Sequence, residues 1–360
     1  MSASAAETLS VADGPPSASE RAAASERARV ADLAQRQVLW GVVLGIVSAI
    51  CYTATNIALR GVTRDGDADW ALWVTAMKSL PSALSAWVLL GGRAVGGLST
   101  LPPLRTILIL MAVGFAVQGG GNVLFQWSLA RCGLALSVPT VFATLMLTGA
   151  VLGRAWLGES VTIRSTIAMG LLIGAIGILS YGAEGAAAAL PAGPSDFSPK
   201  FWVLSGIAFA AIAGVFYGVL GVVIRQTTRD SVPLPATLAI VSSTGVLGVG
   251  VPAVVRLGPE ILQATSQEWG LMVLAGVLNA IAFFAIGGSL RRIPVVQVNL
   301  LNASQAAMCA IGGVLVYREP LTAALIGGTL LTIVGLTLMS RRSGGTRGIA
   351  PAVSQGSPRE

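Results

Sequence analysis

Ten apolar windows, separated by short charged or Pro/Gly-rich breaks, constrain this chain more than any other feature of its sequence. A helix needs about 20 mainly apolar residues to cross the hydrocarbon core of a bilayer. The chain is 54% hydrophobic and 11% charged, whereas an ordinary soluble domain is about 25% charged. We therefore expect an all-α membrane protein with ten transmembrane helices. The predicted spans are 39–60, 70–91, 105–128, 134–153, 163–182, 201–224, 235–256, 269–290, 295–316 and 321–340.

The distribution of Arg and Lys predicts the orientation of these spans. Short cytoplasmic loops are enriched in positive charge. If the N-terminus is placed inside, sixteen basic residues fall in cytoplasmic segments and six in external ones. We therefore predict a multi-pass protein of the cell inner (plasma) membrane with both termini in the cytoplasm.

The chain contains an internal repeat. The segment YTATNIALRGVTRD, which begins at Tyr52, aligns without gaps with YGVLGVVIRQTTRD, which begins at Tyr217, and the Tyr, both Arg, the last Thr and the Asp are identical. Apolar segments match by chance at Leu and Val rather than at such polar residues, so this similarity indicates duplication. Five spans per half make the two halves cross the membrane in opposite directions, which is the inverted-repeat plan of many secondary transporters.

The repeat and the composition together predict the boundaries of the chain's parts. Residues 1–37 lack an apolar core and are predicted to be a disordered cytoplasmic tail. The first five-helix repeat covers 38–184, an Ala/Pro/Gly-rich linker covers 185–200, and the second five-helix repeat covers 201–340. Residues 341–360, rich in Gly, Ser, Pro and Arg, form a second cytoplasmic tail.

Two segments that follow the fourth and ninth windows resemble a family signature. LGESVT at 157–162 and YREPLT at 317–322 resemble the EamA-like, ten-helix branch of the drug/metabolite transporter superfamily, and the resemblance extends over about 39–340. Small residues follow each Glu nine and sixteen positions later, at Ala168, Ala175, Gly328 and Gly335. The resemblance implies a secondary transporter of small organic metabolites such as amino acids or nucleosides, with export as the expected direction and alternating access through a central polar cavity as the mechanism.

Lys78 is the one charged residue well inside a predicted span. A Lys at the centre of a membrane helix costs about 2.5 to 3.5 kcal/mol, so its side chain should face protein or water. One interpretation is a site for a substrate carboxylate or phosphate, or a titrating amine. A snorkelling lysine, or one paired within the protein, explains the residue as well.

Amides and hydroxyls near the midpoints of several spans predict a polar cavity. Gln118, Asn122 and Gln126 recur every four residues and so share one helical face. The alternative is hydrogen bonding between helices, which is worth about 0.6 kcal/mol on average. The residues predicted to bind substrate are Lys78, Gln118, Asn122, Gln126, Thr144, Asn279, Asn302, Gln305, Tyr52, Asn56 and Tyr217.

The remaining polar residues do not predict an enzyme. The chain has no His, and Asp65, Asp67 and Asp69 lie in one short loop without a fourth ligand, so we predict a solvated loop rather than a metal site. Glu159 and Glu319 stand at helix starts and are predicted to be caps. No catalytic residue, metal or cofactor is predicted.

The expected partners are the lipid bilayer and a small-molecule substrate. The net charge of +7 is dispersed along the chain, which argues against binding of nucleic acid. Two other functions stay open. One is a flippase of lipid-linked carriers, and the other is a membrane-embedded metal-dependent transferase, which would need clustered acids at one membrane face.

Overall fold

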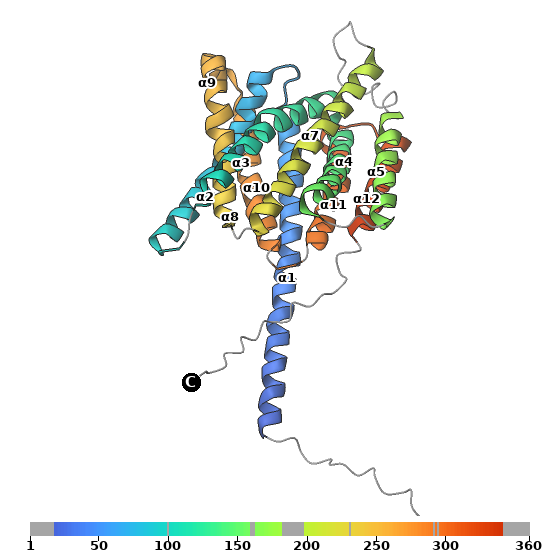
Figure 1. The fold of residues 1–360 in the computed structure, drawn as a ribbon. Coiled ribbons are helices and arrows are strands. Elements are labelled where there is room, and N and C mark those ends of the chain that lie inside the picture. The colour runs from blue at the N-terminus through green and yellow to red at the C-terminus, as the bar shows by residue number, and fades with distance from the viewer. Residues whose placement is uncertain are drawn as a thin grey trace, which may run out of the picture.

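The computed structural model describes residues 18–98, 101–158, 163–181, 198–229, 232–290, 292–293 and 295–340. Within these ranges the regular elements are all helices, which confirms the predicted all-α class (Figure 1). Glu159, Asp230, the predicted C-terminal tail and most of the predicted linker lie outside the described residues.

The helices of the first half are α1 (Ala18–Arg60), α2 (Ala68–Val95), α3 (Leu104–Phe115), the π-helix η1 (Ala116–Gly121), α4 (Asn122–Leu157) and α5 (Ile163–Tyr181). Those of the second half are α7 (Pro199–Arg229), α8 (Leu234–Ser243), the π-helix η2 (Thr244–Gly250), α9 (Val251–Leu257), the 3-10 helix η3 (Gly258–Gln263), α10 (Ser266–Leu290), α11 (Val295–Tyr317) and α12 (Ala323–Ser340).

Helical segments of the described chain are long and apolar enough to cross a membrane at 32–60, 104–156, 199–224, 234–263 and 266–289. The segment at 104–156 has 53 residues, and a straight helix of that length measures about 80 Å, far more than the ~30 Å core of a bilayer. It bends at Gly133, whose φ of 74° and ψ of 178° are not helical. This one residue separates two predicted windows. Each predicted window overlaps a helix, while the number of crossings stays a prediction.

Helix α1 begins earlier than the apolar pattern suggests. It starts at Ala18, so residues 18–37, predicted as part of a disordered tail, are helical. Their composition of Ala, Arg, Glu, Leu and Gln explains the difference, because these residues have the highest intrinsic helix propensity. The ion pair between Arg36 Nε and Asp32 Oδ2, at 2.9 Å, supports the same segment.

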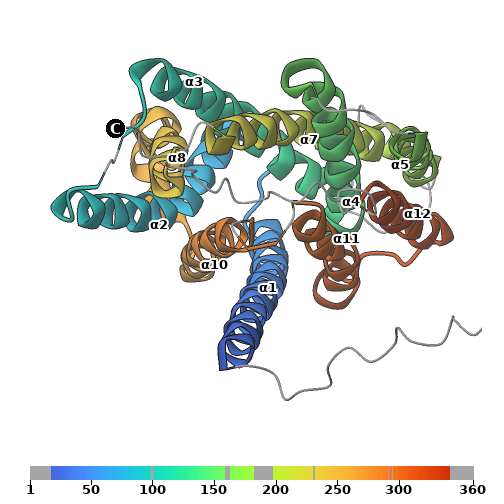
Figure 2. The same cartoon turned by 60° about the horizontal axis from the view of Figure 1, so that its bottom comes forward.

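The two copies of the repeated sequence run in opposite directions through the bundle. In Figure 1, α1 rises from the bottom of the view into the bundle, whereas α7 runs downward from the upper right. The contacts between helices cross from one half to the other in the same way in both copies. Helix α1 packs on α10 and α11 of the second half, while α7 packs on η1 and α4 of the first half. Figure 2 shows α5 beside α12 at one side of the bundle and α2 beside α8 at the other. This arrangement is what an inverted repeat predicts.

Glycines bring α4 and α7 into close contact. A Cβ atom at Gly214 would lie 2.6 Å from the Val141 carbonyl oxygen, and one at Gly218 would lie 2.9 Å from the Leu145 carbonyl oxygen. Both distances are shorter than real Cβ contacts, so a side chain at either position would push the two backbones apart. Small residues at such interfaces let membrane helices approach closely.

We expect Gly214→Val to reduce the yield of folded protein several-fold and to lower its thermal midpoint in detergent, because the valine overlaps the α4 backbone. Gly170→Val in α5 is the matched control, since a Cβ atom there meets nothing within 4 Å. Size-exclusion chromatography and a thermal melt measure both variants. Equal stability of the two variants would contradict the packing described for α4 and α7.

Candidate functional site

A hydrogen-bonded chain of polar side chains connects α2, α4, α7 and α8. Lys78 Nζ donates to Asn122 Oδ1 at 2.6 Å, and the Tyr217 hydroxyl donates to the same oxygen at 2.8 Å. Asn122 Nδ2 donates to Gln118 Oε1 at 2.5 Å, and Gln118 Nε2 donates to the Val241 carbonyl at 3.3 Å. Helices of both halves therefore meet around Asn122. We call Lys78, Gln118, Asn122 and Tyr217 the central polar cluster.

Irregular backbone surrounds this cluster. Gln118 lies in η1, and π-helical turns occur frequently at functional sites. Gly245 of η2 packs on it, because a Cβ atom there would lie 2.9 Å from Gln118 Nε2. Pro81, three residues after Lys78 in α2, has no N–H and leaves the Met77 carbonyl without its helical donor. Backbone of this kind at membrane depth occurs where it is buried in protein or lines a water-filled cavity.

Gln126 and Asn279 connect α2 to its neighbours on either side. Gln126 Nε2 donates to the Ala71 carbonyl at 2.8 Å and to Thr75 Oγ1 at 3.1 Å. Asn279 Nδ2, on α10, donates to Ser82 Oγ at 3.1 Å. Both amides therefore bond to α2 rather than to members of the central polar cluster.

Asn302 and Gln305 form a second polar group between α1 and α11. Asn302 Oδ1 accepts from Gln305 Nε2 at 2.7 Å and from Ser48 Oγ at 3.4 Å. Asn56, also on α1, donates to the Cys309 sulfur at 3.9 Å. This group is separate from the central polar cluster in its hydrogen bonding.

Two other residues predicted to bind substrate have simpler surroundings. Thr144 lies in the interface between α4 and α7, where its hydroxyl donates to the Thr140 carbonyl at 3.1 Å and where Gly214 packs on it. Close packing of the two helices, rather than a cavity, thus accounts for the position of Thr144. Tyr52 is half-buried on α1, one turn before Asn56.

Ion pairs gather at the end of the bundle that the charge distribution predicts to be external. Arg131 Nε pairs with Asp65 Oδ1 at 2.7 Å, and its Nη1 donates to Ser205 Oγ of α7 at 2.9 Å. Arg64 Nη2 pairs with Glu268 Oε1 of α10 at 3.0 Å. The contacts to Ser205 and Glu268 join the first half of the chain to the second. We call these five residues the external ion cluster.

Aromatic rings hold both arginines of the external ion cluster. The Arg64 guanidinium carbon lies 3.5 Å from the ring centroid of Trp70, and that of Arg131 lies 4.1 Å from the ring centroid of Trp202. Arginine stacks well on aromatic faces because its planar charge is weakly hydrated. Sequence analysis missed this cluster. The one signal that could have indicated it is the repeated Arg-Asp pair, Arg64-Asp65.

The three aspartates after α1 do not gather around a metal site. Asp69 pairs with Arg256 Nη1 at 3.1 Å, and Asp67 caps α2 by accepting the Trp70 N–H at 2.8 Å. Asp65 is exposed, as predicted for a solvated loop, and it also belongs to the external ion cluster. Among the residues that the structure describes, no group of three His, Cys, Asp or Glu side chains is placed to hold a metal ion.

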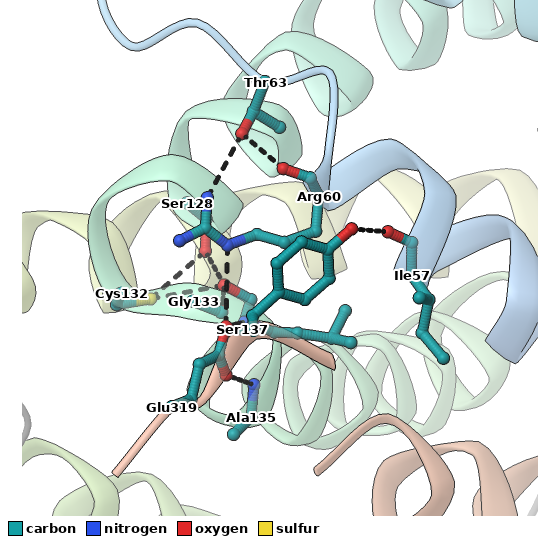
Figure 3. Close-up of polar contacts among 11 residues, drawn as sticks. Ile57, Arg60, Thr63, Ser128, Cys132, Gly133, Ala135, Ser137 and Glu319 are labelled. Carbon is teal, nitrogen blue, oxygen red and sulfur yellow. Dashed lines mark hydrogen bonds and ion pairs between the residues drawn. The ribbon is translucent and has the colours of Figure 1, made fainter. Parts of the chain in front are cut away.

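Glu319 caps a helix other than the one that follows it in the sequence. Its carboxylate accepts the N–H groups of Leu134 at 2.7 Å and Ala135 at 2.8 Å, in the first turn of α4 after the bend (Figure 3). Gly133 makes the bend possible, because its φ is positive and a Cβ atom would lie 2.5 Å from Glu319 Oε1. Arg60 Nε lies 3.5 Å from the same oxygen and completes a buried ion pair.

Comparison with known proteins agrees with this architecture. The model of the EamA-like transporter family matches residues 204–341. A solved crystal structure of another protein superposes on 85% of this chain and 99% of its own, with a TM-score of 0.56 and 18% sequence identity. At that identity the likeness shows the fold alone. None of the curated proteins compared with the chain matches it.

Apolar helices around a polar centre, together with this match, indicate a multi-pass membrane transporter of the drug/metabolite type. Residues 204–341, which include the second Glu-containing segment, are similar to the EamA-like transporter family, part of the drug/metabolite transporter superfamily. The resemblance predicted from the two Glu-containing segments is thus confirmed.

We expect Glu319→Ala to destabilise the protein by about 3 to 5 kcal/mol, because removal of one partner leaves the other charge of a buried pair uncompensated. Asp32→Ala is the control, since its pair with Arg36 is exposed and such pairs contribute about 0 to 1 kcal/mol. A thermal melt in detergent measures the loss of stability of both variants. A Glu319→Ala melt that matches wild type would show that the cap is dispensable.

Proposed function

We propose that this protein is a secondary transporter that exports small organic metabolites, such as amino acids or nucleosides, by alternating access through a site built around the central polar cluster. The observation that carries the proposal is the meeting of both halves at Asn122, whose side chain bonds to Lys78, Gln118 and Tyr217. In transporters built from inverted repeats, the substrate lies near the bilayer midplane at the interface of the repeats.

The external ion cluster supports alternating access. Arg131 and Arg64 tie the first half to α7 and α10 at one end of the bundle. The segments at 128–131 and 289–292 both read Ser-Leu-x-Arg, which makes Arg292 the repeat counterpart of Arg131. Arg292 is exposed and donates at 2.8 Å to the Gly288 carbonyl of α10, the helix that it follows. Equivalent arginines therefore differ at the two ends, as expected for a state closed at the external end.

Counterflow in proteoliposomes tests the proposed function. Purified protein is reconstituted, and uptake is measured for a radiolabelled panel of amino acids, short monocarboxylates, nucleosides, monoamines and sugar phosphates. We expect at least one class to move, and Asn122→Ala to reduce its initial rate about tenfold or more, because Lys78, Gln118 and Tyr217 all lose a partner, at about 1 to 3 kcal/mol for a buried group left unsatisfied.

Gln263→Ala is the matched control for this measurement. Gln263 is an exposed amide in η3, so its removal should leave transport unchanged. If no compound on the panel moves, or if Asn122→Ala transports like wild type, the proposed site is wrong.

Cys132 reports on closure of the external end, because it follows Arg131 directly and is 1% exposed. In a Cys51→Ser, Cys309→Ser background, we expect Asp65→Asn to speed labelling by an external, membrane-impermeant maleimide about tenfold. Loss of a charge-assisted hydrogen bond worth about 1.5 to 3 kcal/mol accounts for this change.

Asp69→Asn is the control for that labelling experiment. It removes a similar ion pair, but its partner Arg256 is 63% exposed at the rim, so labelling should not change. Equal labelling rates in the two variants would contradict a closing role for the Arg131–Asp65 pair.

A further inference from the structure

The Lys78 amine has hydrogen-bonding capacity that the described protein does not use. A protonated lysine has three N–H donors, and the one acceptor that the structure gives Lys78 is Asn122 Oδ1. No carboxylate among the described residues pairs with Lys78. The sequence gives the reason, since every Asp and Glu of the chain lies in a tail, a loop or a helix end outside the predicted spans. Within the part of the chain that the structure describes, the positive charge therefore has no counter-ion.

A positive charge held at this depth without a counter-ion indicates a ligand that supplies one. We infer that the transported substrate carries a carboxylate, and that Lys78 binds this carboxylate through its free donors. The inference rests on the proposed function, because it assigns the class of substrate to the same site. The partial exposure of Lys78, in a helix whose neighbours Ser79 and Thr75 are buried, is consistent with a route to the amine.

The charge balance favours a carboxylate over a phosphate ester. One lysine neutralises one negative charge, whereas a phosphate monoester carries about 1.5 to 2 near neutral pH. A second cation would be needed, and three arginines of the first half of the chain are engaged elsewhere. Arg60, Arg64 and Arg131 each pair with a carboxylate at the external end.

The rest of the central polar cluster is uncharged. Gln118, Asn122 and Tyr217 offer amide and hydroxyl groups, which orient polar atoms of a ligand without adding charge. A nucleoside would satisfy these groups but would leave Lys78 uncompensated. A monoamine would add a second positive charge beside the first. Both classes lack a carboxylate to pair with Lys78 and are therefore disfavoured relative to compounds that carry one.

The panel of the counterflow experiment separates the inference from the proposed function. We expect amino acids or monocarboxylates to move and the methyl ester or amide of the same compound to move at least tenfold more slowly. Transport of nucleosides, monoamines or sugar phosphates in place of carboxylates leaves the proposed function standing and overturns the inference. If nothing on the panel moves, both are overturned.

Variants at Lys78 test whether this amine binds the carboxylate. Lys78→Arg keeps the charge and should retain the preference for acid over ester, while Lys78→Met should abolish it. Lysine occurs in the chain only at positions 78 and 200, so Lys200→Met is the matched control for loss of a lysine charge. A preference for acid over ester that survives in Lys78→Met overturns the inference.

Chemical protection gives a readout that does not depend on transport. In a Lys200→Arg background, Lys78 is the one lysine available to reductive methylation, and peptide mass spectrometry separates it from the N-terminal amine. We expect the carboxylate that moved in counterflow to slow methylation of Lys78 several-fold and its amide to have no effect. Equal rates with the acid and with the amide would show that the carboxylate does not contact Lys78.

Discussion

A membrane helix can break only where other groups replace its lost backbone hydrogen bonds, and the fold of this protein depends on one such replacement. At Gly133 the backbone leaves the helical region, and the Glu319 carboxylate accepts the next two N–H groups. Leu134, Ala135 and Glu319 are buried, so water does not reach these N–H groups to do the same. The bend returns a helical segment of 53 residues across the bundle, and the carboxylate ties α4 to the chain segment between α11 and α12. Arg60 balances the charge and adds α1 to the same point.

Buried polar groups of the polar centre also need hydrogen-bond partners, but there not every group has one. Gln126, Asn279 and Thr144 have partners that belong to neighbouring helices or to their own backbone. Asn279 and Thr144 therefore hold the bundle together and leave little for a ligand, whereas Gln126 Oε1 is buried without a hydrogen-bond partner. Lys78 differs, because the protein supplies a neutral amide oxygen where a carboxylate is expected. A site that is satisfied except for one charge is suited to binding and release.

The two ends of the bundle complete this arrangement. The external ion cluster joins the halves through Arg131 and Arg64, and its rings and carboxylates are contributed by segments far apart in the sequence. Its ion pairs are partly exposed, so each pair is weak enough to break. Together the pairs still favour one arrangement of the two halves. At the opposite end the repeat places Arg292, which bonds to the Gly288 carbonyl of α10 rather than to the other half. Two similar ends in different states are the minimum that alternating access requires.

The amino-acid sequence by itself determined the helical class and the duplication, because hydropathy and repeated polar residues are properties of single segments. It also indicated Lys78, Gln118, Asn122 and Tyr217, which the tertiary structure brought together. Only the tertiary structure decided which helix Glu319 caps, that Thr144 lies under Gly214, and that Asp65 pairs with Arg131. These are contacts between residues distant in sequence, and the packing of the helices selects them. The helical start of α1 at Ala18 was the reverse case, where local propensity was sufficient and the apolar pattern was the wrong guide.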